Sequence, residues 1–139
     1  MQQLLSRFIL AIAVFFYSAF VAYAQDQAET YTAMVDHDGI QHVRIIGGSY
    51  FFKPNIIVVK KDVPVELTVS KEPGMAPHSI VANAPEAGIV FDESLSTDTK
   101  VIRFTPKAAG KYVFYCKNKL LFFSSHREKG MQGIIEVVD

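Results

Sequence analysis

The sequence predicts an all-β protein, a Greek-key β-sandwich or barrel of about seven strands preceded by a signal peptide. Two observations support this fold class. Short apolar or alternating runs recur along the chain, and Gly, Pro and Asp residues separate them. After residue 24, no long stretch shows the 3.6-residue apolar period of an amphipathic helix.

The first 24 residues have the pattern of an export signal. Arg7 supplies a positive charge, residues 8–21 are uncharged and apolar, and residues 22–24 form a small-x-small cleavage site. A retained membrane anchor is the alternative, but the uncharged run 8–24 is only 17 residues long, the short limit for a bilayer span. We therefore expect a signal peptide at 1–24 and a periplasmic or secreted protein.

The rest of the chain divides into strands bounded by turns. Residues 25–37 are polar and predict a loosely held N-terminus, and Asp-His-Asp-Gly at 36–39 predicts a turn. The segment 84–96 contains Pro85 and Gly88 and has little periodicity, so we expect a longer connection there, with a short helix or none. Alternating or β-branched runs predict strands at 42–46, 56–59, 63–69, 79–81, 101–105, 111–116 and 133–138.

The charge of the chain is balanced, with 14 basic and 14 acidic residues. Proteins that bind nucleic acid usually carry a basic surface, so we expect no nucleic acid partner. His37 and His42 lie near the N-terminus, where a histidine is more often solvated than bound to a metal.

Cys116 is the only cysteine, so an exported chain has no partner for an internal disulfide. Simple burial would protect the thiol, and metal ligation is the alternative. His126 and Met131 follow Cys116, and His78 begins a predicted strand upstream. One thiolate, two imidazoles and one thioether suit a single copper ion, whereas zinc is poorly served by a thioether.

Several motifs form a set with these residues: Phe-Lys-Pro-Asn-Ile-Ile-Val at 52–58, Val-Pro-Val-Glu-Leu-Thr-Val at 63–69, Phe-Thr-Pro at 104–106, Gly-Lys-Tyr-Val-Phe-Tyr-Cys at 110–116 and Gly-Met-Gln-Gly at 130–133. The set resembles the cupredoxins, the type 1 blue-copper-like family. The resemblance begins near Gly48. We therefore assign 48–139 to a cupredoxin-like domain and 25–47 to an N-terminal segment with the first strand.

The resemblance implies a ligand set for one mononuclear copper ion. His78, Cys116 and His126 would be the equatorial ligands and Met131 the axial one. The four residues between His126 and Met131 are similar to the spacing in rusticyanin-type proteins. The C-terminal ligand loop is also similar to that of cytochrome oxidase subunit II, but its binuclear site needs a second cysteine, which this chain lacks.

The connection between Cys116 and His126 is longer than in most members of the family. Nine residues separate the two ligands, where two to four are usual in the family. This length predicts a more open site in which His126 is held less firmly. Met75 is a conceivable substitute thioether, and an ordinary loop methionine is the simpler interpretation.

The long loop contains a run of four apolar residues at 120–123, which either caps the core or forms a dry surface beside the site. Lys117, Lys119, Arg127 and Lys129 surround it and are opposed only by Glu128, a local net charge of +3. This charge predicts a redox protein partner with an acidic docking face. We expect contact with a membrane only through an uncleaved N-terminal segment.

The expected function is electron transport by a single-electron Cu(I)/Cu(II) shuttle. A copper carrier or chaperone and a metal-free cupredoxin-like accessory module are the alternatives. We expect no enzyme, because no third orienting group or oxyanion signature accompanies Cys116 and His126.

Overall fold

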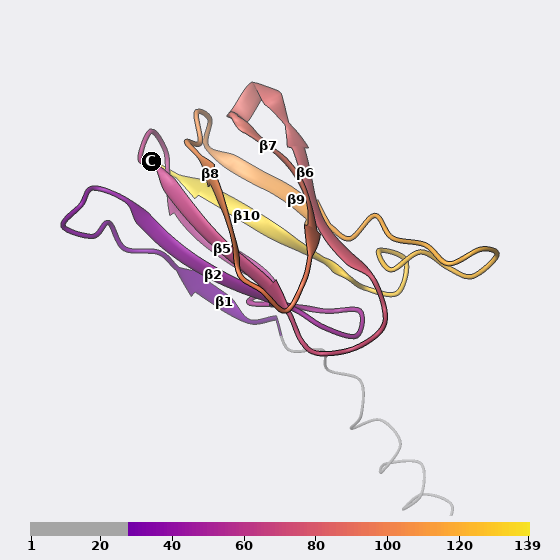
Figure 1. The fold of residues 1–139 in the computed structure, drawn as a ribbon. Coiled ribbons are helices and arrows are strands. Elements are labelled where there is room, and N and C mark those ends of the chain that lie inside the picture. The colour runs from indigo at the N-terminus through magenta and orange to yellow at the C-terminus, as the bar shows by residue number, and fades with distance from the viewer. Residues whose placement is uncertain (1–27) are drawn as a thin grey trace, which may run out of the picture.

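The structure is a computed structural model, and it describes residues 28–139. Two β-sheets face each other in this part of the chain (Figure 1). The predicted signal peptide at 1–24 lies outside the described residues. Within 28–139, no helix has the length and apolar character needed to span a bilayer.

The larger sheet has six strands in the order β1, β4, β10, β9, β6 and β7, and the smaller has four in the order β3, β2, β5 and β8. Parallel pairs join β4 to β10 and β2 to β5. The bounds are β1 Thr30–Thr32, β2 Gln41–Gly47, β3 Phe52–Lys53, β4 Ile56–Lys60, β5 Val65–Lys71, β6 His78–Ala84, β7 Ile89–Leu95, β8 Lys100–Phe104, β9 Gly110–Tyr115 and β10 Gln132–Val138.

The predicted all-β sandwich is confirmed, with more strands than expected among the described residues. The strands β1 and β3 are very short additions. The larger difference is β7, which fills most of the segment 84–96 that we expected to be a connection. A 3₁₀ turn, η2 (Pro85–Ala87), precedes it, so the short helix considered for this segment is limited to that turn.

The core lies between the two sheets and follows the alternation of the strands. In β5 the buried residues are Val65, Leu67 and Val69, as their period of two predicts. Phe52 and Phe114 meet edge to face across the core, with ring centroids 5.2 Å apart. Burial of this apolar surface is the main favourable contribution to the folding free energy.

Gln41 is a polar residue whose side chain is fully buried. Gln41 donates from Nε2 to the carbonyl oxygens of Lys60 and Val63, and its Oε1 accepts from the Lys60 N–H at 2.6 Å. Because all of these groups are paired, Gln41 links the start of β2 to the end of β4 without leaving a buried polar atom unsatisfied.

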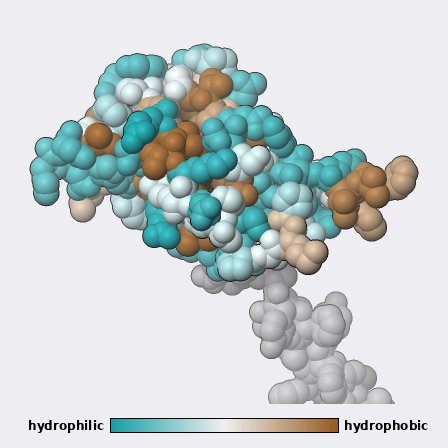
Figure 2. All heavy atoms as spheres, viewed as in Figure 1, coloured by the Kyte–Doolittle hydropathy of each residue, from teal (hydrophilic) through white to brown (hydrophobic). Residues whose placement is uncertain are grey.

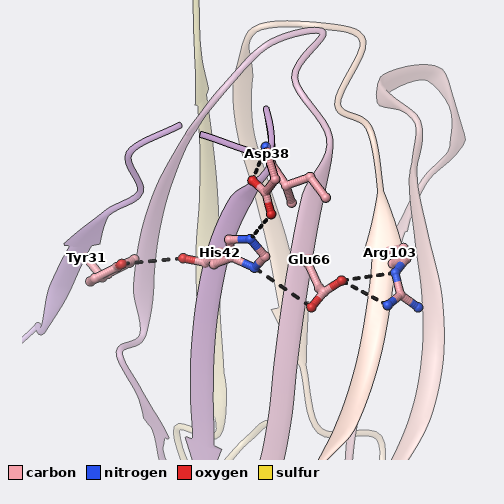
Figure 3. Close-up of polar contacts among 6 residues, drawn as sticks. Tyr31, Asp38, His42, Glu66 and Arg103 are labelled. Atoms are coloured by element: carbon pink, nitrogen blue, oxygen red, sulfur yellow. Dashed lines mark hydrogen bonds and ion pairs between the residues drawn. The ribbon is translucent and has the colours of Figure 1, made fainter. Parts of the chain in front are cut away.

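A row of polar side chains crosses the outer surface of the smaller sheet (Figure 3). His42 Nε2 lies 2.9 Å from an Asp38 carboxylate oxygen, and His42 Nδ1 lies 3.8 Å from Glu66. Glu66 in turn accepts from Arg103 at 2.9 Å. The hydrogen bond to Asp38 is the main cause that raises the pKa of His42 above its ordinary value of 6.5.

We predict that Asp38→Asn lowers the pKa of His42 toward 6.5, as measured by NMR pH titration of its ring protons. Because folding raises this pKa, protonated His42 stabilises the native state below pH 6.5, and the contribution disappears as the pH rises through the folded-state value. A titration midpoint that does not move in Asp38→Asn would contradict the assigned cause.

Candidate metal centre

Three neighbouring strands bring predicted site residues to one end of the larger sheet. The strand β9 lies between β6 and β10 and runs antiparallel to both. His78 is the first residue of β6, Cys116 directly follows β9, and Met131 directly precedes β10. Antiparallel pairing places the start of one strand beside the end of its neighbour, so these three residues come to the same edge.

Cys116 and the two histidines form a compact group. Their donor atoms all lie within 4.8 Å of one another, and the three side chains are buried. His126 Nδ1 lies 3.1 Å from His78 Nδ1 and 3.5 Å from Cys116 Sγ. Neither His37 nor His42 belongs to this group.

The surroundings of the two imidazoles favour their neutral form. Burial lowers the pKa of His78, and the positive charges of His126 and Lys71 lower this pKa further. Burial also lowers the pKa of His126, with a smaller contribution from Lys129. A histidine must be deprotonated to bind a metal, so near neutral pH these rings are ready to act as ligands.

Polar groups from β6 and from the loop after β9 lie around the sulfur of Cys116. The Ser79 N–H donates toward Sγ at 3.4 Å, and the Ser79 hydroxyl lies 3.7 Å from Sγ and accepts from the Lys117 N–H. The Asn118 side chain lies 3.4 Å from Sγ, and a flip of its amide would present N–H groups to a thiolate. These groups can hold a sulfur that carries negative charge.

Met131 is fully buried beside the group. Its N–H donates to the His126 carbonyl at 2.9 Å, and its carbonyl accepts from the Cys116 N–H at 3.0 Å. A Cβ atom at Gly47 would stand 2.9 Å from a Leu95 methyl carbon and 3.3 Å from the Met131 methyl carbon, so the glycine in β2 leaves room for both side chains. Met131 is therefore fixed through its backbone to both Cys116 and His126.

A backbone hydrogen bond explains how the nine-residue connection still brings His126 close to Cys116. The His126 N–H donates to the Asn118 carbonyl at 2.9 Å. This bond closes the loop at its base, so residues 119–125 form an excursion outside the ligand group. Along the path from Cys116 through this hydrogen bond to His126, only Lys117 and Asn118 stand between the two residues. Two residues are within the range usual for the family, and His126 is held at both its N–H and its carbonyl.

The excursion projects away from the two sheets (Figure 1). Leu120, Leu121, Phe122 and Phe123 are 63, 75, 100 and 62% exposed, so the interpretation that they cap the core is wrong. Lys117 pairs with Asp92 at 2.5 Å, which reduces the net charge of +3 around the loop to +2. The apolar run is therefore exposed rather than packed in the core, and the positive charge around it is weaker than expected.

A pocket of about 520 Å³ lies between this loop and the segment that precedes β6. His126 lines it, together with Tyr50, Asn118 and Phe123. The pocket therefore reaches His126, one of the two histidines of the group. Met75 also lines it, but this side chain is fully exposed, which agrees with an ordinary loop methionine.

Sequence reasoning missed three residues that shape the site. Ser79 supplies its backbone N–H, Asn118 supplies its carbonyl, and Gly47 supplies space. Only Asn118 carried a signal, because Asn two residues after a strand is a common turn former. The roles of the other two depend on pairing between distant strands.

The donor set fits a single copper ion. One sulfur and two imidazole nitrogens in a trigonal arrangement are the donors that copper sites of this kind use. With metal–ligand bonds of about 2.0–2.3 Å, such donors stand about 3.5–3.8 Å apart. The separations of 3.1 and 3.5 Å are within a few tenths of an ångström of that requirement.

Comparisons with known proteins agree with this geometry. No protein-family model and no curated protein matches the chain. The Cu(I)-bound metal-binding domain of the Cu(I)-exporting P-type ATPase CopA from Streptococcus pneumoniae is 29% identical, with 81% of this chain and 99% of that domain aligned and a TM-score of 0.59.

Two other solved structures share the fold at lower identity. Auracyanin from Roseiflexus castenholzii is 18% identical over 70% of this chain and 97% of its own, with a TM-score of 0.57. A chain of a heme-copper terminal oxidase is 16% identical over 99% of this chain and 97% of its own, with a TM-score of 0.59. The protein therefore has the cupredoxin fold, as the sequence predicted, with a buried His-Cys-His group at one end of a sheet.

We predict that residues 119–124 can be replaced by one glycine without loss of the fold. That glycine and Ser125 would then form the two central positions of a hairpin-type turn closed by the same Asn118–His126 hydrogen bond. Because loop length has a small effect on closure entropy, the free energy of unfolding should change by less than about 1 kcal/mol. Chemical denaturation measures this change, and loss of hydrogen-exchange protection at the His126 N–H would contradict the closure.

Proposed function

We propose that this protein is an exported mononuclear copper protein that carries single electrons between redox partners. The buried group of His78, Cys116 and His126 is the observation that carries the proposal. A copper ion held there would supply the one-electron change between Cu(I) and Cu(II). The similarity to a Cu(I)-bound domain at 29% identity supports the choice of metal.

The way the ligands are held supports electron transfer. Electron exchange is fast when little moves between oxidation states, so the ligands must come from a stiff support. We assign the equatorial positions to His78, Cys116 and His126 and the axial position to Met131. Two adjacent strands fix His78 and Cys116, and backbone hydrogen bonds hold the other two residues.

The exposed side of the site supports a route for electrons through His126. This residue lines the pocket, whereas Cys116 has no exposed surface. Lys119 and Lys129 also line the pocket, so we propose a redox protein partner with an acidic face at this opening. The enclosure of Cys116 also argues against a thiol enzyme, because a substrate has no access to the sulfur.

A copper carrier is the second candidate, and the pocket is the observation that favours it. An opening beside His126 would let an acceptor approach one ligand and take the ion. The two functions differ in one measurable property. A shuttle keeps its ion through repeated oxidation and reduction, whereas a carrier loses it to an acceptor.

We predict that Cu(II) added to the metal-free protein produces an intense thiolate-to-copper band in the visible spectrum. Cys116→Ala should abolish the band, because the charge-transfer transition needs the thiolate. The neighbouring variant Ser124→Ala serves as the matched control and should keep it. A wild-type spectrum like that of aqueous copper would exclude the proposed site and favour a metal-free accessory module.

We also predict that Met131→Leu keeps the visible band and raises the reduction potential. Leucine fills a similar volume but donates no electron pair, so the oxidised ion loses stabilisation relative to the reduced one. Cyclic voltammetry of the two proteins measures the difference. Complete loss of copper from Met131→Leu would show that the thioether is more than a weak axial ligand.

A further inference from the structure

The end of the long loop exposes four large apolar side chains in a row. We call residues 120–123 the loop tip. Phe122 is fully exposed and Leu121 is 75% exposed. In Figure 2 brown apolar atoms gather at the end of a projection on the right of the molecule. Exposed apolar clusters of this kind usually mark a surface that contacts a partner or a membrane.

The backbone makes the loop tip convex and keeps it away from the sandwich. The Phe123 N–H donates to the Leu120 carbonyl at 2.9 Å, which closes a tight turn, and Leu121 has a positive φ of 44°. Leu120 and Phe123 line the pocket beside His126, whereas Leu121 and Phe122 do not. The two most exposed side chains therefore face solvent and contribute nothing to the pocket.

Basic residues stand on both sides of the loop tip in the sequence, at Lys119, Arg127 and Lys129. Arg127 lies over the Tyr115 ring at 4.3 Å, and Lys129 lies over the Tyr50 ring at 4.4 Å. Lys119 is the third cation. Glu128 lies between Arg127 and Lys129 in the sequence and accepts hydrogen bonds from Ser125. Segments that bind at a membrane interface often combine apolar residues, which enter the lipid, with adjacent basic residues, which contact anionic headgroups.

We propose that the loop tip inserts into the surface of an anionic phospholipid membrane, with Leu121 and Phe122 among the acyl chains and the three cations at the headgroups. A convex tip favours lipid over a protein partner, because lipid adapts to its shape whereas a protein would need a matching cavity. This contact differs from the N-terminal anchor considered from the sequence. It requires no copper, and it would hold the pocket beside His126 close to the bilayer surface.

The test uses metal-free protein that starts at Gln25, which retains every strand of the described sandwich. Co-sedimentation with vesicles of phosphatidylcholine, alone or mixed with phosphatidylglycerol, measures binding. We expect binding to the anionic vesicles that weakens with added salt. The double variant Leu121→Ser/Phe122→Ser should lower the affinity by at least about tenfold. Lys119→Gln/Lys129→Gln should lower binding to anionic vesicles only.

Two matched controls remove similar groups elsewhere. Val90→Ser/Val101→Ser changes two exposed apolar residues, one on β7 and one on β8. Lys107→Gln removes an exposed cation that lies outside the loop. Both controls should bind like the wild type, and circular dichroism should show that all variants are folded. Because no copper is present, the result is separate from the test of the metal site.

Three outcomes would overturn the proposal. The first is no binding of the wild type to anionic vesicles, which would leave an acidic protein as the favoured occupant. The second is unchanged binding of Leu121→Ser/Phe122→Ser. The third is that the wild type binds no vesicles and forms a dimer in analytical ultracentrifugation, while the double variant stays monomeric. This result would show that the loop tip contacts a second copy of the chain.

Discussion

The position of β9 between two antiparallel neighbours is the constraint on which the site depends. It places the end of β9 beside the starts of β6 and β10, so residues far apart in the sequence reach the same edge of the sheet. The inward-facing side chains of these strands, such as Phe114, Ile80 and Ile135, are fully buried between the two sheets, where close packing allows little movement. The sulfur and one imidazole are consequently positioned by the most rigid part of the molecule, before any metal binds.

His126 depends on a weaker element, because it comes from a loop. Its position is secured by a hydrogen bond on each side of the residue, to Asn118 and to Met131. The Tyr50 ring also packs against its imidazole in a T-shaped arrangement, with the centroids 5.1 Å apart. The site thus combines two residues set by strands with two that rely on local hydrogen bonds, and of the second pair only His126 lines the pocket.

Much of the fold followed from local patterns. Val65, Leu67 and Val69 alternate cleanly with polar residues, so β5 was predictable, and the lone Cys116 pointed to the site. The strand β7 was missed because Glu93 interrupts the inward-facing apolar series of Ile89, Phe91 and Leu95. Hydrogen bonding to β6 along its full length makes this segment a strand, although its local sequence pattern is weak.

The candidate site was predictable only in part. Residue types and spacing indicated His78, Cys116 and His126, and the structure brings these three together. The closure at Asn118 could not be predicted, because it is a contact between two backbone groups. Loop length alone therefore suggested a looser site than the geometry provides. The sequence also could not predict whether residues 120–123 are exposed, because an apolar run of this length is compatible with both burial and exposure.

The closure at the base of the loop separates two kinds of sequence freedom. Residues outside the segment 119–125 must keep the fixed local geometry of the sandwich. The sequence of 119–125 is constrained only by its contacts with solvent or with other molecules. Peptides of other lengths and compositions could be grafted between these two positions, so protein engineers could attach a new recognition element here, close to the buried His-Cys-His group.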